Sequence, residues 1–397
     1  MLRGRVSGWW IPLGLLLSAP LGCNSILGIE EAEVTPTGGG TGGTAGAAAG
    51  ASGAGGTAGS VGGASGAAGC TANLDNDPDN CGSCAHSCLG NGCSSGQCQA
   101  ELVTETPWGA ASIALTASAI FWGNTLSGVL YRYDRTTKMT TNTHLGTDVS
   151  EVYAEGSDVY AFVDKGDEIF RVPASGGTPQ SIIKVGAATS SFGVDQSGVY
   201  WVTCPSSSSG EVYRANLDGG GPTKLVDVSL CPLTLRLDAT HIYFATSKSS
   251  GIYRVSKASP HTPQLIGSAN PGSVALFVTD TDVFFADFDY MNWSAGDVYR
   301  VPKGGGPPLT IAKDQLITSA ILEANGKVYW TNRGTWSKFT DGSVQAAPVQ
   351  GTTVGSSVAL GTGLGAPESL ALDATHVYWL LSGSNVPGPG SIWRVAR

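Results

Sequence analysis

The side chains with the clearest chemistry are nine cysteines, and six of them fall within one short segment. These six are Cys70, Cys81, Cys84, Cys88, Cys93 and Cys98. The residues between them are mostly Asn, Asp, Gly and Ser, so the segment cannot bury an apolar core and needs covalent cross-links. We therefore expect a small disulfide-rich module at 70–98 with three disulfides. Its 15 connectivities remain open.

A zinc site is the alternative for the same segment. Cys81 and Cys84 have the two-residue spacing of zinc ligands, and His86 and Cys88 follow closely. Disulfides are favoured because thiols pair in the oxidising environment that an exported chain meets. The acidic run 75–80 offers oxygen ligands for calcium, but it lacks the glutamate and the spacing of an EF-hand loop. We interpret it as a solvated turn.

The first 22 residues have the plan of an export signal. Two arginines precede an apolar run at 9–17, and small residues follow it. The run is too short to span a bilayer, which takes about 20 apolar residues. Leu21-Gly22-Cys23 resembles the lipobox of bacterial lipoproteins, in which the cysteine becomes the lipidated first residue of the mature chain. Pro20 departs from that pattern, and an ordinary signal peptide at 1–22 is the alternative.

A lipidated Cys23 also accounts for the odd number of cysteines, because the other eight can then pair. Residues 23–34 would begin the mature chain. Residues 35–69 are nearly all Gly, Ala, Ser and Thr, a composition that cannot offset its own ordering entropy, so we expect a disordered linker. This interpretation anchors the protein by lipid in a bacterial cell envelope, at the outer membrane or the cell surface.

Everything after Gln99 repeats. An aromatic pair, or a weakened copy of one, recurs with its first residue at positions 121, 160, 200, 243, 284, 329 and 378. Intervals of 39 to 49 residues built from short strands are typical of β-propeller blades. A glycine–apolar–aromatic–arginine strand follows most of the pairs, and turn residues separate the strands. We predict seven units of four strands each.

One further strand can close the ring. The third strand of the seventh unit lies next to Arg397, whereas Glu101-Leu102-Val103-Thr104 stands unassigned before the first unit and matches the fourth strands of other units. A strand from the N-terminal side would cover the exposed edge of the last blade. The predicted fold class is therefore all-β: residues 99–397 form a seven-bladed propeller whose last blade is closed by an N-terminal strand.

The segment Val328-Tyr329-Trp330-Thr331-Asn332 resembles the repeat of the YWTD propellers of the low-density-lipoprotein receptor family. The resemblance extends to period and strand order but covers few residues per blade, so it implies a fold and not a partner. The chain also resembles predicted bacterial surface lipoproteins with a cysteine-rich module, mainly in spacing and composition.

Several recurring residues are interpreted as structural. The arginine of the third strand most simply serves packing or hydrogen bonding in the blades, and the aromatic residues pack between blades. Cys204 follows a second strand, and Cys231 precedes a first strand. Both connections fall on one rim of a propeller, so we expect a disulfide between neighbouring blades.

The same rim is the expected binding surface, because long loops within repeats commonly carry function. Its candidate residues are Asp287, Asp289, Tyr290, Trp293 and Trp336. Exposed aromatic side chains beside carboxylates suit a protein or glycan ligand. The alternative is that the tryptophans fold back over the blades. Calcium held by Asp287 and Asp289 is a weaker hypothesis, and no other cofactor or metal is expected.

Composition narrows the function further. Only 13% of the residues are charged and the net charge is −9, so a nucleic-acid partner is not expected. The histidines and acidic residues form no recognisable Ser/His/Asp arrangement. We expect a monomeric, membrane-anchored binding or scaffold protein rather than an enzyme. The alternative is a propeller lyase, lactonase or glycoside hydrolase with its site in the central channel.

Overall fold

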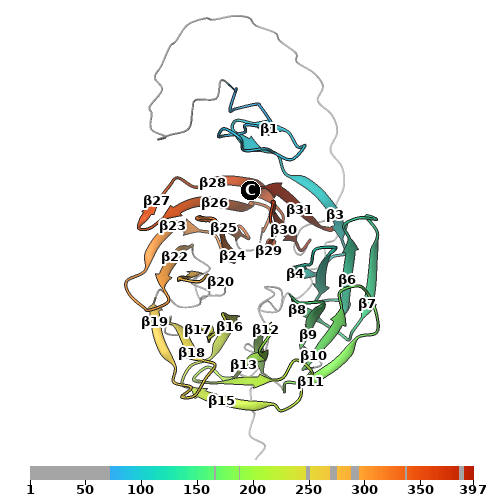
Figure 1. Ribbon diagram of the computed structural model, residues 1–397, viewed down its shortest axis with the longest axis vertical. Helices are drawn as coiled ribbons and strands as arrows, with labels where there is room; N and C mark the ends of the chain where they lie inside the picture. The colour runs from blue at the N-terminus through green and yellow to red at the C-terminus, as the bar shows by residue number, and fades with distance from the viewer. Residues whose placement is uncertain are drawn as a thin grey trace, which may run out of the picture.

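The repeats fold into seven antiparallel sheets arranged in a ring around one axis (Figure 1). The computed structural model describes residues 72–164, 167–186, 188–246, 251–268, 275–287, 295–335, 338–383 and 389–397. Each sheet is a blade with its first strand next to the axis and its fourth strand outermost. The prediction of a seven-bladed propeller with four-stranded blades is confirmed.

The first three blades contain strands β4 to β15. Blade 1 contains β4 (Ala110–Leu115), β5 (Ala119–Asn124), β6 (Val129–Asp134) and β7 (Thr140–His144). Blade 2 contains β8 (Val149–Glu155), β9 (Asp158–Val163), β10 (Glu168–Pro173) and β11 (Gln180–Lys184). Blade 3 contains β12 (Thr189–Asp195), β13 (Gly198–Ser206), β14 (Ser209–Ala215) and β15 (Thr223–Val228).

Strands β16 to β31 form the other blades, together with β3. Blade 4 contains β16 (Pro232–Leu237), β17 (His241–Thr246), β18 (Gly251–Ser256) and β19 (Gln264–Ser268). Blade 5 contains β20 (Ala275–Val278), β21 (Asp282–Ala286), β22 (Gly296–Pro302) and β23 (Leu309–Gln315). Blade 6 contains β24 (Thr318–Ala324), β25 (Lys327–Asn332), β26 (Gly342–Gln350), β27 (Thr353–Val354) and β28 (Val358–Leu364). Blade 7 contains β29 (Pro367–Leu372), β30 (His376–Leu381), β31 (Gly390–Ala396) and β3 (Glu101–Thr106).

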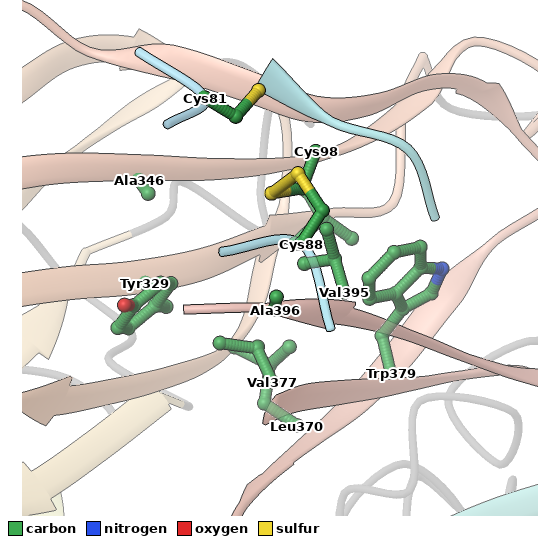
Figure 2. Close-up of a cluster of buried hydrophobic side chains, with 11 residues drawn as sticks. Cys81, Cys88, Cys98, Tyr329, Ala346, Leu370, Val377, Trp379, Val395 and Ala396 are labelled. Carbon is green, nitrogen blue, oxygen red and sulfur yellow. A yellow bond between two sulfur atoms is a disulfide. The ribbon is translucent and has the colours of Figure 1, made fainter. Parts of the chain in front are cut away.

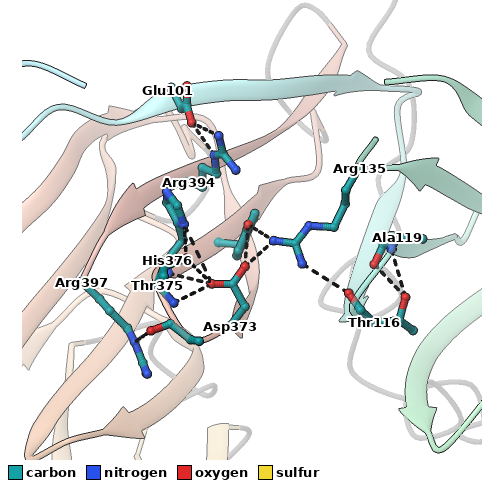
Figure 3. A network of polar contacts seen from close by, with 11 residues as sticks. Glu101, Thr116, Ala119, Arg135, Asp373, Thr375, His376, Arg394 and Arg397 are labelled. Carbon is teal, nitrogen blue, oxygen red and sulfur yellow. Dashed lines mark hydrogen bonds and ion pairs between the residues drawn. The ribbon is translucent and has the colours of Figure 1, made fainter. Parts of the chain in front are cut away.

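Strand β3 closes the ring, as predicted. It pairs antiparallel with β31, and Leu102 lies opposite Trp393. Glu101 forms an ion pair with Arg394 of β31 across this junction (Figure 3). The outer edge of β31 would otherwise expose its backbone N–H and C=O groups, so β3 removes an aggregation-prone edge and joins the two ends of the propeller.

The repeated aromatic and arginine residues hold the blades together. The second aromatic of a pair stacks on the tyrosine of the third strand in four blades, with ring centroids 5.2–5.7 Å apart. Third-strand arginines reach backbone carbonyls of the next blade: Arg132 Nε donates to Ala174 at 3.0 Å, and Arg254 Nη1 donates to Lys303 at 2.6 Å. These contacts support the structural interpretation of the repeated arginine.

A belt of hydrogen bonds links the first strands around the axis. In each case a side-chain oxygen on one first strand accepts a backbone N–H from the first strand of the next blade. The donor–acceptor pairs are Ile113–Ser369, Val152–Ser112, Phe192–Glu151 and Leu235–Ser191, at 3.0–3.3 Å. First strands have no neighbouring strand on the side of the axis, so the belt gives partners to N–H groups that would otherwise be buried and unsatisfied.

The cysteine-rich module is held by disulfides, as predicted. Cys81 pairs with Cys93 and Cys88 pairs with Cys98, and Cys84 is also disulfide-bonded; Cys70 lies outside the described residues. Strands β1 (Cys93–Ser94) and β2 (Gln97–Cys98) form its small hairpin. The zinc alternative is wrong, because zinc needs free thiolates and these sulfurs are bonded to each other.

The module packs on the propeller rather than standing apart from it. Cys81, Cys88 and Cys98 belong to one buried cluster with residues of blades 6 and 7, including Val395 and Trp379. Figure 2 shows the Cys88–Cys98 disulfide beside Val395. The run 75–80 forms turns in which Asp77 accepts hydrogen bonds from the Asp79 N–H and the Asn80 amide, as expected for a solvated turn.

The predicted bridge between blades 3 and 4 is also present. Cys204 and Cys231 are disulfide-bonded across a sequence separation of 27 residues. No helix in the described part of the chain is long and apolar enough to cross a bilayer.

The belt leads to a stability prediction for Ser191→Ala. Ser191 is fully buried; its hydroxyl donates to Glu151 at 3.0 Å and accepts the Leu235 N–H at 3.2 Å. Removing the hydroxyl leaves a buried N–H without a partner, which costs about 1–3 kcal/mol. Urea unfolding should show a loss of that size, whereas the exposed Ser208→Ala should change stability by less than about 0.5 kcal/mol. Equal stability of the two variants would contradict the role of the belt.

Candidate functional site

The ring has two faces, and the predicted rim lies on one of them. We call it the loop face: it carries the connections between second and third strands, such as residues 125–128 in blade 1. The opposite turn face carries the connections between first and second strands, such as 116–118. The Cys204–Cys231 bridge lies on the loop face, between the end of β13 and the residue before β16.

Most of the predicted rim residues lie outside the part of the chain that the structure describes. Asp289, Tyr290, Trp293 and Trp336 lie outside the described residues, as does Cys23. Asp287 is described and is 4% exposed. Its carboxylate accepts a hydrogen bond from the Asp297 N–H at 2.5 Å and one from the Tyr299 hydroxyl at 3.4 Å. This carboxylate therefore connects the two ends of the segment between β21 and β22. Calcium binding by Asp287 and Asp289 stays a prediction.

An apolar pair on the loop face was missed by the sequence analysis. Trp108 is 59% exposed and Leu126 is 57% exposed. The Leu126 side chain lies against the backbone of the residue that follows Trp108, because a Cβ on Gly109 would lie 2.7 Å from it. Gly109 also has φ +89°, a conformation that favours glycine. We call Trp108 and Leu126 the rim pair.

The backbone under the rim pair is fixed by both ends of the propeller. The Asn124 amide of blade 1 donates to the Trp108 carbonyl at 2.7 Å. Gly109 N–H donates to the Ser382 carbonyl of blade 7 at 3.0 Å. The rim pair is thus an exposed apolar surface on a rigid support, placed where β3 leads into blade 1.

The central channel contains a cavity of about 360 Å³ lined by the first strands. Its polar residues include Ser150, Glu151 and Tyr153 of blade 2 and Arg236 of blade 4. Arg236 Nη1 donates to the Tyr153 hydroxyl at 2.7 Å. Blade 3 carries Gly193 at the equivalent position, so these two side chains meet across it. Burial raises the pKa of Glu151, while Arg236 and the Phe192 N–H oppose the rise.

A second buried carboxylate lines the same cavity. Glu368 of blade 7 pairs with Arg333 at 2.7 Å, and both side chains are almost completely buried. Burial raises the pKa of Glu368, and the Arg333 guanidinium acts in the opposite direction. Arg333 follows β25, and its guanidinium lies over the Phe339 ring at 4.7 Å from the ring centroid. Both carboxylates of the cavity are therefore engaged by the propeller's own donors.

The turn face carries polar clamps between blades. Asp238 accepts hydrogen bonds from the Tyr243 hydroxyl at 2.8 Å and from Lys303 of the next blade at 2.5 Å. Asp373, Tyr378 and Arg135 repeat the arrangement between blades 7 and 1 (Figure 3). Burial would raise the pKa of Asp238, but Lys303 and backbone N–H groups outweigh burial and hold that pKa well below its usual range.

Two of the five histidines lie at positions away from the channel cavity. His241 and His376 occupy equivalent turns next to Asp238 and Asp373, and each ring nitrogen Nδ1 contacts the preceding threonine hydroxyl at 2.7–2.8 Å. Neither residue lines the channel cavity. They are the first residues of β17 and β30, directly after turns between first and second strands.

No family model and no curated protein matches this sequence. Solved structures do share the fold. Virginiamycin B lyase from Staphylococcus aureus aligns with a TM-score of 0.57 at 12% identity, over 75% of this chain and 100% of the lyase. U3-55K aligns with a TM-score of 0.58 at 11% identity, over 75% of this chain and 98% of that one. The computationally designed Ika8 protein aligns with a TM-score of 0.52 at 11% identity, over 74% and 98%.

These similarities define the class of the protein: it is a β-propeller that carries a disulfide-bonded module on its N-terminal side. At such low identity they show the fold alone. They do not distinguish a binding protein from an enzyme.

The clamp of Asp238 makes stability depend on pH in a defined direction. The pKa of this carboxyl is lower in the folded chain than the ordinary value of about 3.9. Its contribution is therefore present above about pH 4 and is lost as the pH falls below that value. In urea unfolding between pH 7 and 2.5, Asp238→Asn should lose less stability on acidification than the wild type does. The exposed Asp218→Asn should behave like the wild type; parallel profiles for Asp238→Asn and wild type would refute the clamp.

Proposed function

We propose that this protein is an extracytoplasmic binding protein, anchored by a lipid on Cys23, that docks a protein partner on the loop face at the rim pair. The observation that carries the proposal is the exposure of Trp108 beside Leu126 on a fixed backbone. Tryptophan is enriched among the residues that dominate binding energy, and a rigid support lowers the entropic cost of association. An aliphatic neighbour favours a protein over a glycan.

The compartment is supported by the disulfides. Disulfides persist outside the cytoplasm and are rare within it, and this chain forms the bridges Cys81–Cys93, Cys88–Cys98 and Cys204–Cys231. The signal-like residues 1–22 agree with export. Anchoring at Cys23 then places the propeller next to a membrane of the cell envelope.

A catalytic role receives less support. A glycosidase-type mechanism needs two carboxyl groups free to act as acid and as base or nucleophile. In the described channel, Glu151 is held by Ser191 and the Phe192 N–H, and Glu368 is held by Arg333. Both carboxylates connect neighbouring blades, so this geometry favours a binding function over a catalytic one.

Site-specific crosslinking tests the rim pair. A photo-crosslinking residue in place of Leu126, in intact cells, should give a discrete adduct whose protease digest contains peptides of a second protein. The same residue in place of Met139 is the control, since Met139 is 65% exposed on the turn face of the same blade. Trp108→Ala should reduce the adduct at least tenfold, because truncating such a residue costs about 2 kcal/mol or more. An adduct whose added mass is removed by glycosidases, and whose digest contains no second protein, would replace the protein by a glycan. An adduct unaffected by Trp108→Ala would refute the site.

The anchor is tested separately with Cys23→Ser. The wild-type protein should partition into the detergent phase of Triton X-114 and incorporate labelled palmitate, whereas Cys23→Ser should do neither. Ser25→Ala, two residues further on, is the control and should behave like the wild type. A Cys23→Ser protein that still partitions with detergent would show that the chain has an ordinary signal peptide or another means of attachment.

A further inference from the structure

The channel cavity is lined by polar groups on one side and by apolar side chains on another. Tyr153 and Arg236 provide a hydroxyl and a guanidinium group on the side of blades 2 and 4. Phe277 of blade 5 and Leu322 of blade 6 line it with apolar surface. A volume of about 360 Å³ falls in the lower range of small-molecule sites, which span roughly 300–1,000 Å³ and combine apolar walls with a few fixed polar groups.

Arg236 is held in place by one of its three nitrogen atoms. Nη1 donates both to the Tyr153 hydroxyl and to the Leu235 carbonyl, each at 2.7 Å. Nε and Nη2 form no hydrogen bond or ion pair with the residues that the structure describes. These two nitrogens make up the edge of a guanidinium that binds a carboxylate through two parallel hydrogen bonds. The side chain is therefore pre-oriented, with its carboxylate-binding edge unused.

A second polar group of the cavity also lacks a partner. Ser150 is 3% exposed, lines the cavity, and its hydroxyl has no hydrogen-bond partner within the described chain. Buried polar groups are rarely left unsatisfied, and such a group points to a ligand or an ordered water. The equivalent serines of blades 3 and 6, Ser190 and Ser319, instead bond to a carbonyl of the next blade at 2.6 and 2.7 Å.

We propose that the channel cavity binds a small organic acid. Its carboxylate lies against Nε and Nη2 of Arg236, and its apolar body lies against Phe277 and Leu322. Arg236 and Glu151 have opposite charges, so recognition rests on the paired donors rather than on a positive field. The site is separate from the rim pair, and the channel ligand does not depend on the docking function proposed above.

Calorimetry on the mature full-length protein tests this site without knowledge of the natural ligand. The probes are acetate, benzoate and phenylacetate, with benzamide and phenylacetamide as uncharged matches. Benzoate or phenylacetate should bind saturably with one-to-one stoichiometry, and the corresponding amide should bind at least tenfold more weakly. No saturable binding by any of the three acids, or equal binding of acid and amide, would overturn the proposal.

Two variants place the binding in the channel. Arg236→Gln should weaken acid binding at least tenfold, while Arg171→Gln, which alters a third-strand arginine of blade 2 that pairs with Asp158, should not. Ala371→Phe adds bulk to the cavity lining from blade 7 and should also abolish binding. Thermal unfolding confirms that each variant is folded. Acid binding that persists in both Arg236→Gln and Ala371→Phe would exclude the cavity as the site.

Discussion

The structure depends on how backbone groups at the inner edge of each blade find partners. The first strands surround the axis, so none of them has a strand on its inner side, and their N–H groups must bond elsewhere. Ser112, Glu151, Ser191 and Ser369 supply those partners from the preceding blade. At the junctions from blade 7 through blades 1, 2 and 3 to blade 4, each blade thereby positions the first strand of the next one. The same requirement operates at the outer edge of blade 7, where β3 covers β31.

This constraint also decides which groups remain available for function. The belt uses the Glu151 carboxylate, and a buried ion pair uses Glu368, so the cavity's acidic groups are committed to the architecture. The unused groups are a guanidinium edge, one serine hydroxyl and apolar walls. On the loop face, the junction between β3 and blade 1 presents Trp108 and Leu126 on a backbone tied to both neighbouring blades. Ring closure and the proposed docking surface thus share one segment of chain.

Much of the fold could be predicted because the same residue types recur at equivalent positions of each repeat. The aromatic pairs give the number of blades, the residues from Glu101 to Thr104 match a fourth strand, and Cys204 and Cys231 fall at connections that share a rim. The belt corresponds to a sequence pattern, a polar residue directly before an apolar residue of a first strand, as in Ser112-Ile113 and Ser191-Phe192. This pattern does not predict the belt, because serine is also common in polar turns and the group that the hydroxyl binds belongs to the next blade.

The candidate sites were predicted less well, for physical reasons. Arg333 occurs among polar loop residues, yet it is buried because Glu368, 35 residues further on, neutralises it and Phe339 packs against it. Cys81 and Cys84 have zinc-like spacing, but Cys81 pairs with Cys93 and Cys84 is disulfide-bonded as well. Repeat period, strand order, ring closure and cysteine pairing on the rim were determined by the sequence itself, since they depend on residue types at regular intervals. The Tyr153–Arg236 contact, the exposure of Trp108 and the choice of disulfide partners within the cysteine-rich module were decided only by the tertiary structure, because they depend on distances in the folded chain.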